Sequence, residues 1–346
     1  MIYNASWRSP SNIALVKYWG KHGLQLPRNP SLSFTLSECH TDMRVSVNTE
    51  AVAPGVTVMY DGQPKPAFEP KIRLFFNRIV DRLPWLANAL VSIDSNNTFP
   101  HGAGIASSAS ALSALALCLV DMDSHISGRL APTSSEWWQF ASEMARIGSG
   151  SACRSLFPIA AIWGETGAAP HGSDSYAIPW GDHLADAFKD YRDTILIISA
   201  SEKSVSSTAG HSLMDQLPYA PVRYAEAREN LVRLCDAMGK DHDEAVFAGI
   251  VESEALQLHA LMMCGEHPFI LMEPGTLSVI QKVWQFRRET GLPVCFTLDA
   301  GPNVHLLYPA QHESVVMDWV RHELVRFCAE GRYIQDRVGQ GPEKLA

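Results

Sequence analysis

The feature that most constrains the fold is a loop of small residues, 99–110, that runs directly into an apolar segment. Gly102 and Gly104 lack a Cβ, so a ligand can approach the backbone closely. The start of a following helix offers unpaired N–H groups and the positive end of the helix dipole, which favour an anion. The pattern predicts either a phosphate-binding loop or a glycine turn before a core helix. It is not a Walker A loop, because no Gly-Lys-Ser/Thr follows.

Length and charge narrow the class of protein. The 346 residues allow two domains of about 150 residues each. The net charge of −9 argues against bulk nucleic-acid binding, which needs a basic surface, although a few cations focused in one cleft can still bind phosphates. No signal-like segment and no run of about 18 apolar residues is evident, so we expect a cytoplasmic protein without a membrane partner. The seven cysteines are scattered without CxxC spacing, which predicts neither a zinc site nor disulfides.

The periodicity of apolar residues predicts an α+β chain. Composition places a boundary near 180–190, between an N-terminal phosphate-binding domain, 1–185, and a C-terminal domain, 186–346. Strands are expected at 31–36, 44–49, 56–60, 91–97, 193–199, 294–298 and 303–308. Helices are expected at 71–83, 134–147, 221–238, 243–263, 276–290 and 312–329. Thr133 and Glu136 are predicted to form a capping box at the start of the second helix.

Three charged side chains stand out from these elements. Lys17 lies among apolar residues, and from composition alone we favour a side chain that reaches the surface over one held to meet an anion. Arg154 belongs to a second small-residue loop, 147–155, and its fork suits a carboxylate or phosphate, unless the segment is only a linker. Asp299 ends a predicted strand just before a turn, where it either serves catalysis or caps turn N–H groups.

Six separated motifs then match one family in the same order along the chain. They are 12–21, 30–33, 103–109, 148–155, 206–210 and 299–303. With these motifs the chain resembles the diphosphomevalonate decarboxylases of the GHMP kinase superfamily. The resemblance implies a two-domain fold with a ribosomal protein S5 domain 2-like N-terminal domain and a ferredoxin-like C-terminal domain.

The resemblance also implies a reaction. ATP phosphorylates the tertiary hydroxyl of (R)-5-diphosphomevalonate, and loss of phosphate and CO2 then gives isopentenyl diphosphate. Asp299 would act near the 3-hydroxyl as base or orienter, while Arg154 would meet the substrate carboxylate and help to hold Asp299. The implied catalytic residues are Asp299, Arg154, Asn12, Ser107 and Ser108, with the serine that faces the γ-phosphate left open.

Binding residues follow from the same resemblance. Those implied for the substrate are Lys17, Tyr18, Trp19, Gly20, Lys21, Arg73, Ser149, Gly150, Ser151, Ala152, Cys153, Arg154 and Thr208. Those implied for ATP are Gly102, Ala103, Gly104, Ala106, Ser107 and Ser108. Mg²⁺ is expected with ATP, although no metal ligand is assigned, and a homodimer is expected from the family. The alternatives are a 5-phosphomevalonate decarboxylase, a GHMP small-molecule kinase without decarboxylation, and a binding protein without turnover.

Overall fold

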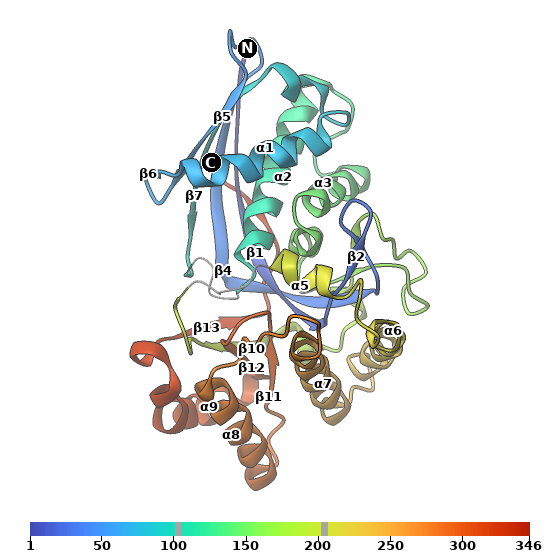
Figure 1. The fold of residues 1–346 in the computed structure, drawn as a ribbon, viewed down its shortest axis with the longest axis vertical. Coiled ribbons are helices and arrows are strands. Elements are labelled where there is room, and N and C mark those ends of the chain that lie inside the picture. The colour runs from blue at the N-terminus through green and yellow to red at the C-terminus, as the bar shows by residue number, and fades with distance from the viewer. Residues whose placement is uncertain (101–104, 202–206) are drawn as a thin grey trace.

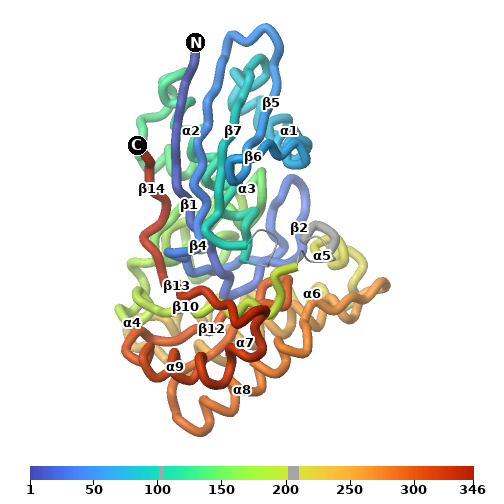
Figure 2. The backbone as a smooth tube through the Cα atoms, turned by 90° about the vertical axis from the view of Figure 1, so that its left-hand side faces the viewer, coloured from blue at the N-terminus to red at the C-terminus, as the bar shows by residue number. Residues whose placement is uncertain are grey.

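The computed structural model describes residues 1–100, 105–201 and 207–346, and the side chains of 207–209 fall outside this description. A large sheet with helices on one face forms the upper half of the molecule in Figure 1, and a smaller sheet with its own helices forms the lower half. Both chain ends lie in the upper half (Figure 2). This arrangement confirms the expected two-domain α+β fold.

The larger sheet contains eight strands within the described part of the chain, in the order β14-β1-β4-β7-β5-β6, with β8 paired to β4 and β9 to β8. These strands are β1 Ile2–Val16, β4 Ser31–Asn48, β5 Gly55–Tyr60, β6 Gln63–Pro64, β7 Leu90–Asn97, β8 Ala160–Trp163, β9 Ala177–Pro179 and β14 Glu343–Lys344. A separate hairpin joins β2 Lys21–His22 to β3 Leu26–Pro27. The two strands predicted at 31–36 and 44–49 are one strand, because β4 stays paired with β1 along nearly its whole length.

The helices of the N-terminal domain cover one face of this sheet and enclose its core. They are α1 Glu69–Ile79, α2 Ser107–Ile126 and α3 Ser135–Gly148. By length and composition alone α2 could cross a membrane, but 78% of its apolar window is buried inside the molecule. Its alanines let neighbouring elements approach closely, as expected for a core helix.

The smaller sheet is antiparallel, in the order β11-β12-β10-β13. Its strands are β10 Tyr191–Leu196, β11 Cys295–Leu298, β12 Val304–Pro309 and β13 Tyr333–Arg337. The helices of this half are α4 Asp186–Lys189, α5 Ser207–Leu213, α6 Ala220–Ala237, α7 Glu244–Met263, α8 Pro274–Thr290 and α9 Glu313–Trp319. Shorter 3-10 helices span Pro66–Phe68, Pro84–Asn88, Gly150–Leu156, Gly181–His183, Ala310–His312, Val325–Phe327 and Ala329–Gly331.

Two local predictions are wrong. The cap of α3 is Ser134, whose side chain accepts the N–H of Trp137, because Thr133 adopts a left-handed backbone with φ of 62°. Of the helix expected at 312–329, only Glu313–Trp319 is α-helical, and the chain then forms a π turn, Val320–Leu324. Apolar periodicity does not distinguish these hydrogen-bond patterns, so the sequence could not predict the change.

A buried carboxylate joins the two sheets. Asp336 of β13 accepts the N–H groups of Ser37 and Glu38 through Oδ1 and that of Cys39 through Oδ2, each at 2.8 Å. Further along, β14 pairs with β1, and the Lys344 ammonium contacts the buried Asp121 carboxylate at 2.7 Å. The end of the chain therefore fastens the C-terminal half to β4 and β1, while the boundary at 185/186 stays a prediction.

We expect the Asp336→Ala variant to lose about 3 kcal/mol of unfolding free energy, because three N–H groups of β4 lose a charged acceptor. Urea unfolding followed by tryptophan fluorescence measures this loss. Asp318→Ala, at a largely exposed carboxylate, is the control and should change stability by less than about 0.5 kcal/mol. Equal stability of the two variants would contradict the assignment.

Candidate active site

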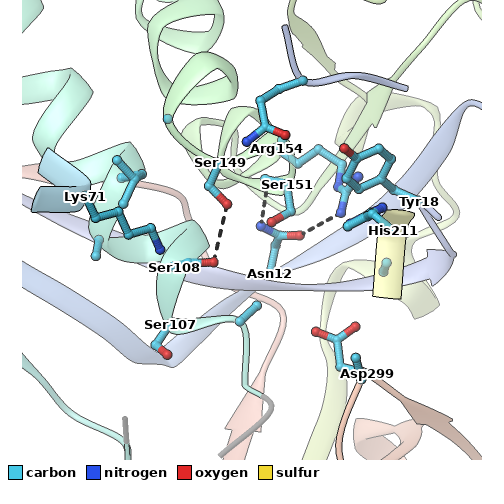
Figure 3. Close-up of a pocket in the computed structure, with 18 of the residues that line it drawn as sticks. Asn12, Tyr18, Lys71, Ser107, Ser108, Ser149, Ser151, Arg154, His211 and Asp299 are labelled. Carbon is cyan, nitrogen blue, oxygen red and sulfur yellow. Dashed lines mark hydrogen bonds between the residues drawn. The ribbon is translucent and has the colours of Figure 1, made fainter. Parts of the chain in front are cut away.

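A cavity of about 480 Å³ opens where the two domains meet (Figure 3). Its walls come from β1 and the turn after it, α1, the start of α2, the end of α3 and the turn after β11. The sequence-predicted site residues that line it are Asn12, Lys17, Tyr18, Trp19, Lys21, Ala106, Ser107, Ser108, Ser149, Gly150, Ser151, Arg154 and Asp299. Motifs that are far apart in sequence therefore meet around one space.

Lys17 and Asp299 form an ion pair across this cavity. Lys17 follows β1, Asp299 follows β11, and their Nζ and Oδ1 atoms are 3.7 Å apart. Lys17 is 1% exposed, so the surface position favoured from composition is wrong. Its ammonium also donates to the carbonyl of Ala14 at 2.7 Å. Burial lowers the pKa of Lys17 to about 8, and the neighbouring Asp299 opposes that shift.

Arg154 is buried in the 3-10 helix that follows α3. Its Nε and one terminal nitrogen donate to the hydroxyls of Ser33 and Ser31, at 3.1 and 2.5 Å, and the other nitrogen donates to Asn12 Oδ1 at 3.3 Å. Within the described part of the chain these hydrogen-bond acceptors are all neutral. A buried cation held by neutral groups keeps an unbalanced charge, which an anionic ligand can offset.

The expectation that Arg154 helps to hold Asp299 needs correction. Among the residues that the structure describes, the cation within ion-pair distance of Asp299 is Lys17. Arg154 acts on that carboxylate only at longer range, where Asp299 raises the pKa of the guanidinium and burial lowers it more strongly. Asn12 links Arg154 to the cavity floor, because its amide nitrogen donates to Ser155 Oγ and to the carbonyl of Ser151.

The serines predicted to meet the nucleotide stand at the first turn of α2. Ala106 adopts a left-handed backbone, with φ of 49°, and leads into Ser107 and Ser108. The Ser108 and Ser149 hydroxyls lie 3.3 Å apart, which brings the two small-residue loops together (Figure 3). Both α2 serines line the cavity, so the choice between them stays open.

The remaining predicted ATP residues, Gly102, Ala103 and Gly104, lie outside the described residues. The same is true of the Thr208 side chain. These four assignments stay predictions.

Other predicted residues surround the cavity without lining it. The Gly20 N–H donates to His211 Nδ1 at 3.0 Å, and Ala152 and Cys153 are fully buried behind the wall. The Arg73 side chain is half exposed, and its guanidinium contacts Glu69 and the carbonyl of its β5 neighbour. In this structure Arg73 is therefore not placed to contact a ligand in the cavity.

Among the lining residues that were not predicted, Lys71 and His211 carry basic side chains. Lys71 comes from α1, two residues before Arg73, and faces the cavity (Figure 3). His211 comes from α5, and its ring packs against Tyr18 and Trp19 with centroids 4.5 and 4.6 Å away. For Lys71 the sequence offered a signal, because the helical spacing of the apolar residues already indicated which face of this helix is buried. Ile72, on that face and next to Lys71, also lines the cavity. For His211 the signal in the sequence was its position directly after the 206–210 motif.

Glycine is required at one wall position. A Cβ on Gly150 would lie 2.9 Å from the Tyr18 ring and from Trp163. The loop after α3 can therefore pack against the Tyr18 ring only because residue 150 has no side chain. This packing sets the position of Ser149 and Ser151, which line the cavity on either side.

Comparisons with known proteins identify the fold and then the family. The whole chain aligns with a mevalonate diphosphate decarboxylase structure from Staphylococcus aureus, with a TM-score of 0.85, 28% identity and 99% of that structure's chain covered. It also aligns over its full length with MDDEF in complex with MVAPP, AMPPCP and magnesium, with a TM-score of 0.83, 26% identity and 99% of that chain covered. The fold is thus the two-domain GHMP kinase-like fold.

Sequence comparison is more specific. Residues 9–177 match the diphosphomevalonate decarboxylase-like N-terminal domain, and residues 194–343 match the mevalonate 5-diphosphate decarboxylase C-terminal domain. Diphosphomevalonate decarboxylase from Saccharomyces cerevisiae is 32% identical over 92% of this chain and 81% of the relative. The Ganoderma lucidum enzyme of the same name is 29% identical over 98% of this chain and 85% of its own length. The chain belongs to the diphosphomevalonate decarboxylase family.

The lowered pKa of Lys17 predicts a pH dependence. We expect kcat/KM of the wild type to fall above about pH 8, as Lys17 loses the proton that balances Asp299. In Lys17→Arg the cation stays protonated, so any remaining activity should persist beyond about pH 9. Steady-state rates from pH 6 to 10 measure both profiles. An unchanged basic limb in Lys17→Arg would contradict the assignment to Lys17.

Proposed function

We propose that this chain catalyses the ATP-dependent decarboxylation of (R)-5-diphosphomevalonate to isopentenyl diphosphate, with release of ADP, phosphate and CO2. The observation that carries the proposal is the ion pair between the buried Lys17 and the partly exposed Asp299, beside the buried Arg154 in one cavity. The names of the relatives and the MVAPP complex of a structural neighbour support the same reaction.

Phosphates need cations and N–H donors. The cavity offers Lys21 from β2 and Lys71 from α1, together with the first turn of α2, where the positive end of the helix dipole favours an anion. We assign the nucleotide phosphates to the α2 side, at Ser107 and Ser108. The substrate diphosphate is assigned to Tyr18, Lys21 and the loop 149–151.

We assign Asp299 to the 3-hydroxyl of the substrate. Its carboxylate faces the cavity and is partly exposed there, while the Lys17 ammonium, 3.7 Å away, balances its charge. As base or orienter it directs the hydroxyl oxygen to the γ-phosphorus of ATP, and ADP leaves. Phosphoryl transfer of this kind depends mainly on positioning and charge stabilisation.

The elimination then needs a fixed carboxylate. Phosphate departs with the electron pair of the C–O bond, the C–C bond to the carboxylate supplies the electrons of the new double bond, and CO2 is released. Arg154 and Asn12, which are already hydrogen-bonded to each other, are assigned to hold the substrate carboxylate. The Asp299 carboxylate stabilises positive charge that develops at the neighbouring carbon.

Magnesium is proposed to accompany the nucleotide, as the complex of MDDEF with AMPPCP and magnesium supports. The residues that the structure describes contain no group of three His, Cys, Asp or Glu side chains that could hold a metal by themselves. The donors that fit are the nucleotide phosphates and the Ser107 and Ser108 hydroxyls, because Mg²⁺ prefers oxygen ligands. When bound, Mg²⁺ neutralises phosphate charge. The homodimer and the cytoplasmic location remain predictions.

Asp299→Asn tests the proposed reaction. We expect CO2, ADP and isopentenyl diphosphate to form together in the wild type, and their rate to fall about 10²–10⁴-fold in the variant, because the amide cannot take the proton. Fluorescence titration with a nonhydrolysable ATP analogue should give nearly equal affinity for both proteins. ADP release without CO2 in the wild type would instead identify a small-molecule kinase.

Lys21→Ala tests which substrate is recognised. Lys21 lines the cavity, so its loss should raise KM for 5-diphosphomevalonate about 10-fold or more, with a smaller effect on 5-phosphomevalonate. Steady-state kinetics with both substrates provides the measurement. A wild-type kcat/KM that is higher for the monophosphate would overturn the diphosphate assignment.

A further inference from the structure

One helix holds the main chain on both sides of the Lys17–Asp299 pair. Two buried polar side chains of α7, Glu254 and His259, point to this pair, but each bonds to a main-chain atom of the pair. Leu258, which lies between them in sequence, lines the cavity itself. The helix therefore lies directly behind the reacting groups.

Glu254 fixes the peptide of Lys17. Its Oε2 accepts the Lys17 N–H at 2.8 Å, and both carboxylate oxygens accept the Arg223 guanidinium of α6. The same guanidinium donates to the Lys17 carbonyl at 3.3 Å, and Asn29 donates to that carbonyl at 3.0 Å. Both polar atoms of the Lys17 main chain are thus held by a buried network at the point where the chain leaves β1.

His259 fixes the peptide of Asp299. Its Nε2 lies 3.0 Å from the Asp299 carbonyl oxygen. A carbonyl can only accept, so His259 carries its proton on Nε2 and donates it. Burial lowers the pKa of His259 to about 4, so the ring is neutral near neutral pH and places no positive charge beside Lys17.

The spacing explains why one helix can do both. Glu254 and His259 are five residues apart, which separates them by about 7.5 Å along the axis of α7 and by about 140° around it, so they face different neighbours. The helix packs against both β1 and β11, the strands that lead into Lys17 and Asp299. A rigid helix that grips the two peptides sets the distance between the two side chains.

Stability alone does not explain these groups. A buried ion pair such as Arg223–Glu254 is often no more stable than apolar residues of the same volume. These groups do fix the orientation of the ion pair. Glu254 and Arg223 hold the main chain of Lys17, and His259 holds that of Asp299.

We propose that Glu254 and His259 are positioning residues that set the separation of Lys17 and Asp299 for the reaction. The inference rests on the proposed function, since it assigns the pair to catalysis. It predicts that a loosened Asp299 peptide lowers kcat without weakening substrate binding.

The test compares two substitutions of His259. In His259→Phe no donor remains, and we expect kcat to fall about 10–100-fold, as small misplacements of reacting groups do. KM should stay within about threefold. His259→Gln keeps an amide N–H for the carbonyl, so its kcat should stay within about threefold of the wild type. His322→Phe, at an exposed histidine far along the chain, is the matched control.

The pH profile separates positioning from a merely structural role. The charges around Lys17 are Asp299 and Glu254, which raise its pKa, and Arg154, which lowers it. If Asp299 moves away in His259→Phe, the basic limb of kcat/KM should shift to lower pH, whereas His259→Gln should keep it in place. Melting temperatures of all variants show whether a lost fold accounts for a lost rate.

The outcomes decide the proposal. A lower kcat with a shifted limb in His259→Phe and rescue in His259→Gln supports it. A native kcat in His259→Phe, or equal losses in both variants with an unmoved limb, overturns it. The wild type and Asp299→Asn in the same assay distinguish this inference from the proposed function. If the wild type releases no CO2, the proposed function fails. If the wild type releases CO2, Asp299→Asn is slow and His259→Phe keeps the wild-type rate, only this inference fails.

Discussion

The structure depends on keeping a lysine charged where water is excluded. Removing an ammonium from water is costly, and the chain offsets that cost for Lys17 with the carboxylate of Asp299 and the carbonyl of Ala14. Because Lys17 and Asp299 come from different domains, their ion pair exists only when the two sheets are packed correctly. The cavity, the buried Arg154 and the network on α7 are arranged around this requirement.

The sequence was most informative where local chemistry decides the structure. The small-residue loops, the strand before Asp299 and the long apolar helices could all be predicted, because glycine turns and periodicity are local properties. The family motifs placed Asn12, Arg154 and Asp299 in one site, and the structure brings them together. Composition alone misjudged Lys17, because burial of its charge depends on Asp299, a partner 282 residues further along the chain.

What the sequence could not provide was which side of each element faces the cavity. On α1 the face that lines it carries Lys71, whereas Arg73 turns toward Glu69. His211 enters the site only because α5 packs against Tyr18 and Trp19, a contact between distant segments. The roles of Glu254 and His259 were also hidden, because their partners are main-chain atoms, which no side-chain pattern identifies.

The late position of Asp336 has a consequence for synthesis. A chain emerging from the ribosome completes β1, β4 and most of the cavity wall long before the carboxylate that ties β4 to the smaller sheet is made. Domains generally fold from the N-terminus as they are synthesised. The N-terminal sheet therefore keeps an open edge beside β1 until the segment that carries Asp336 and β14 has left the ribosome and can pack against it.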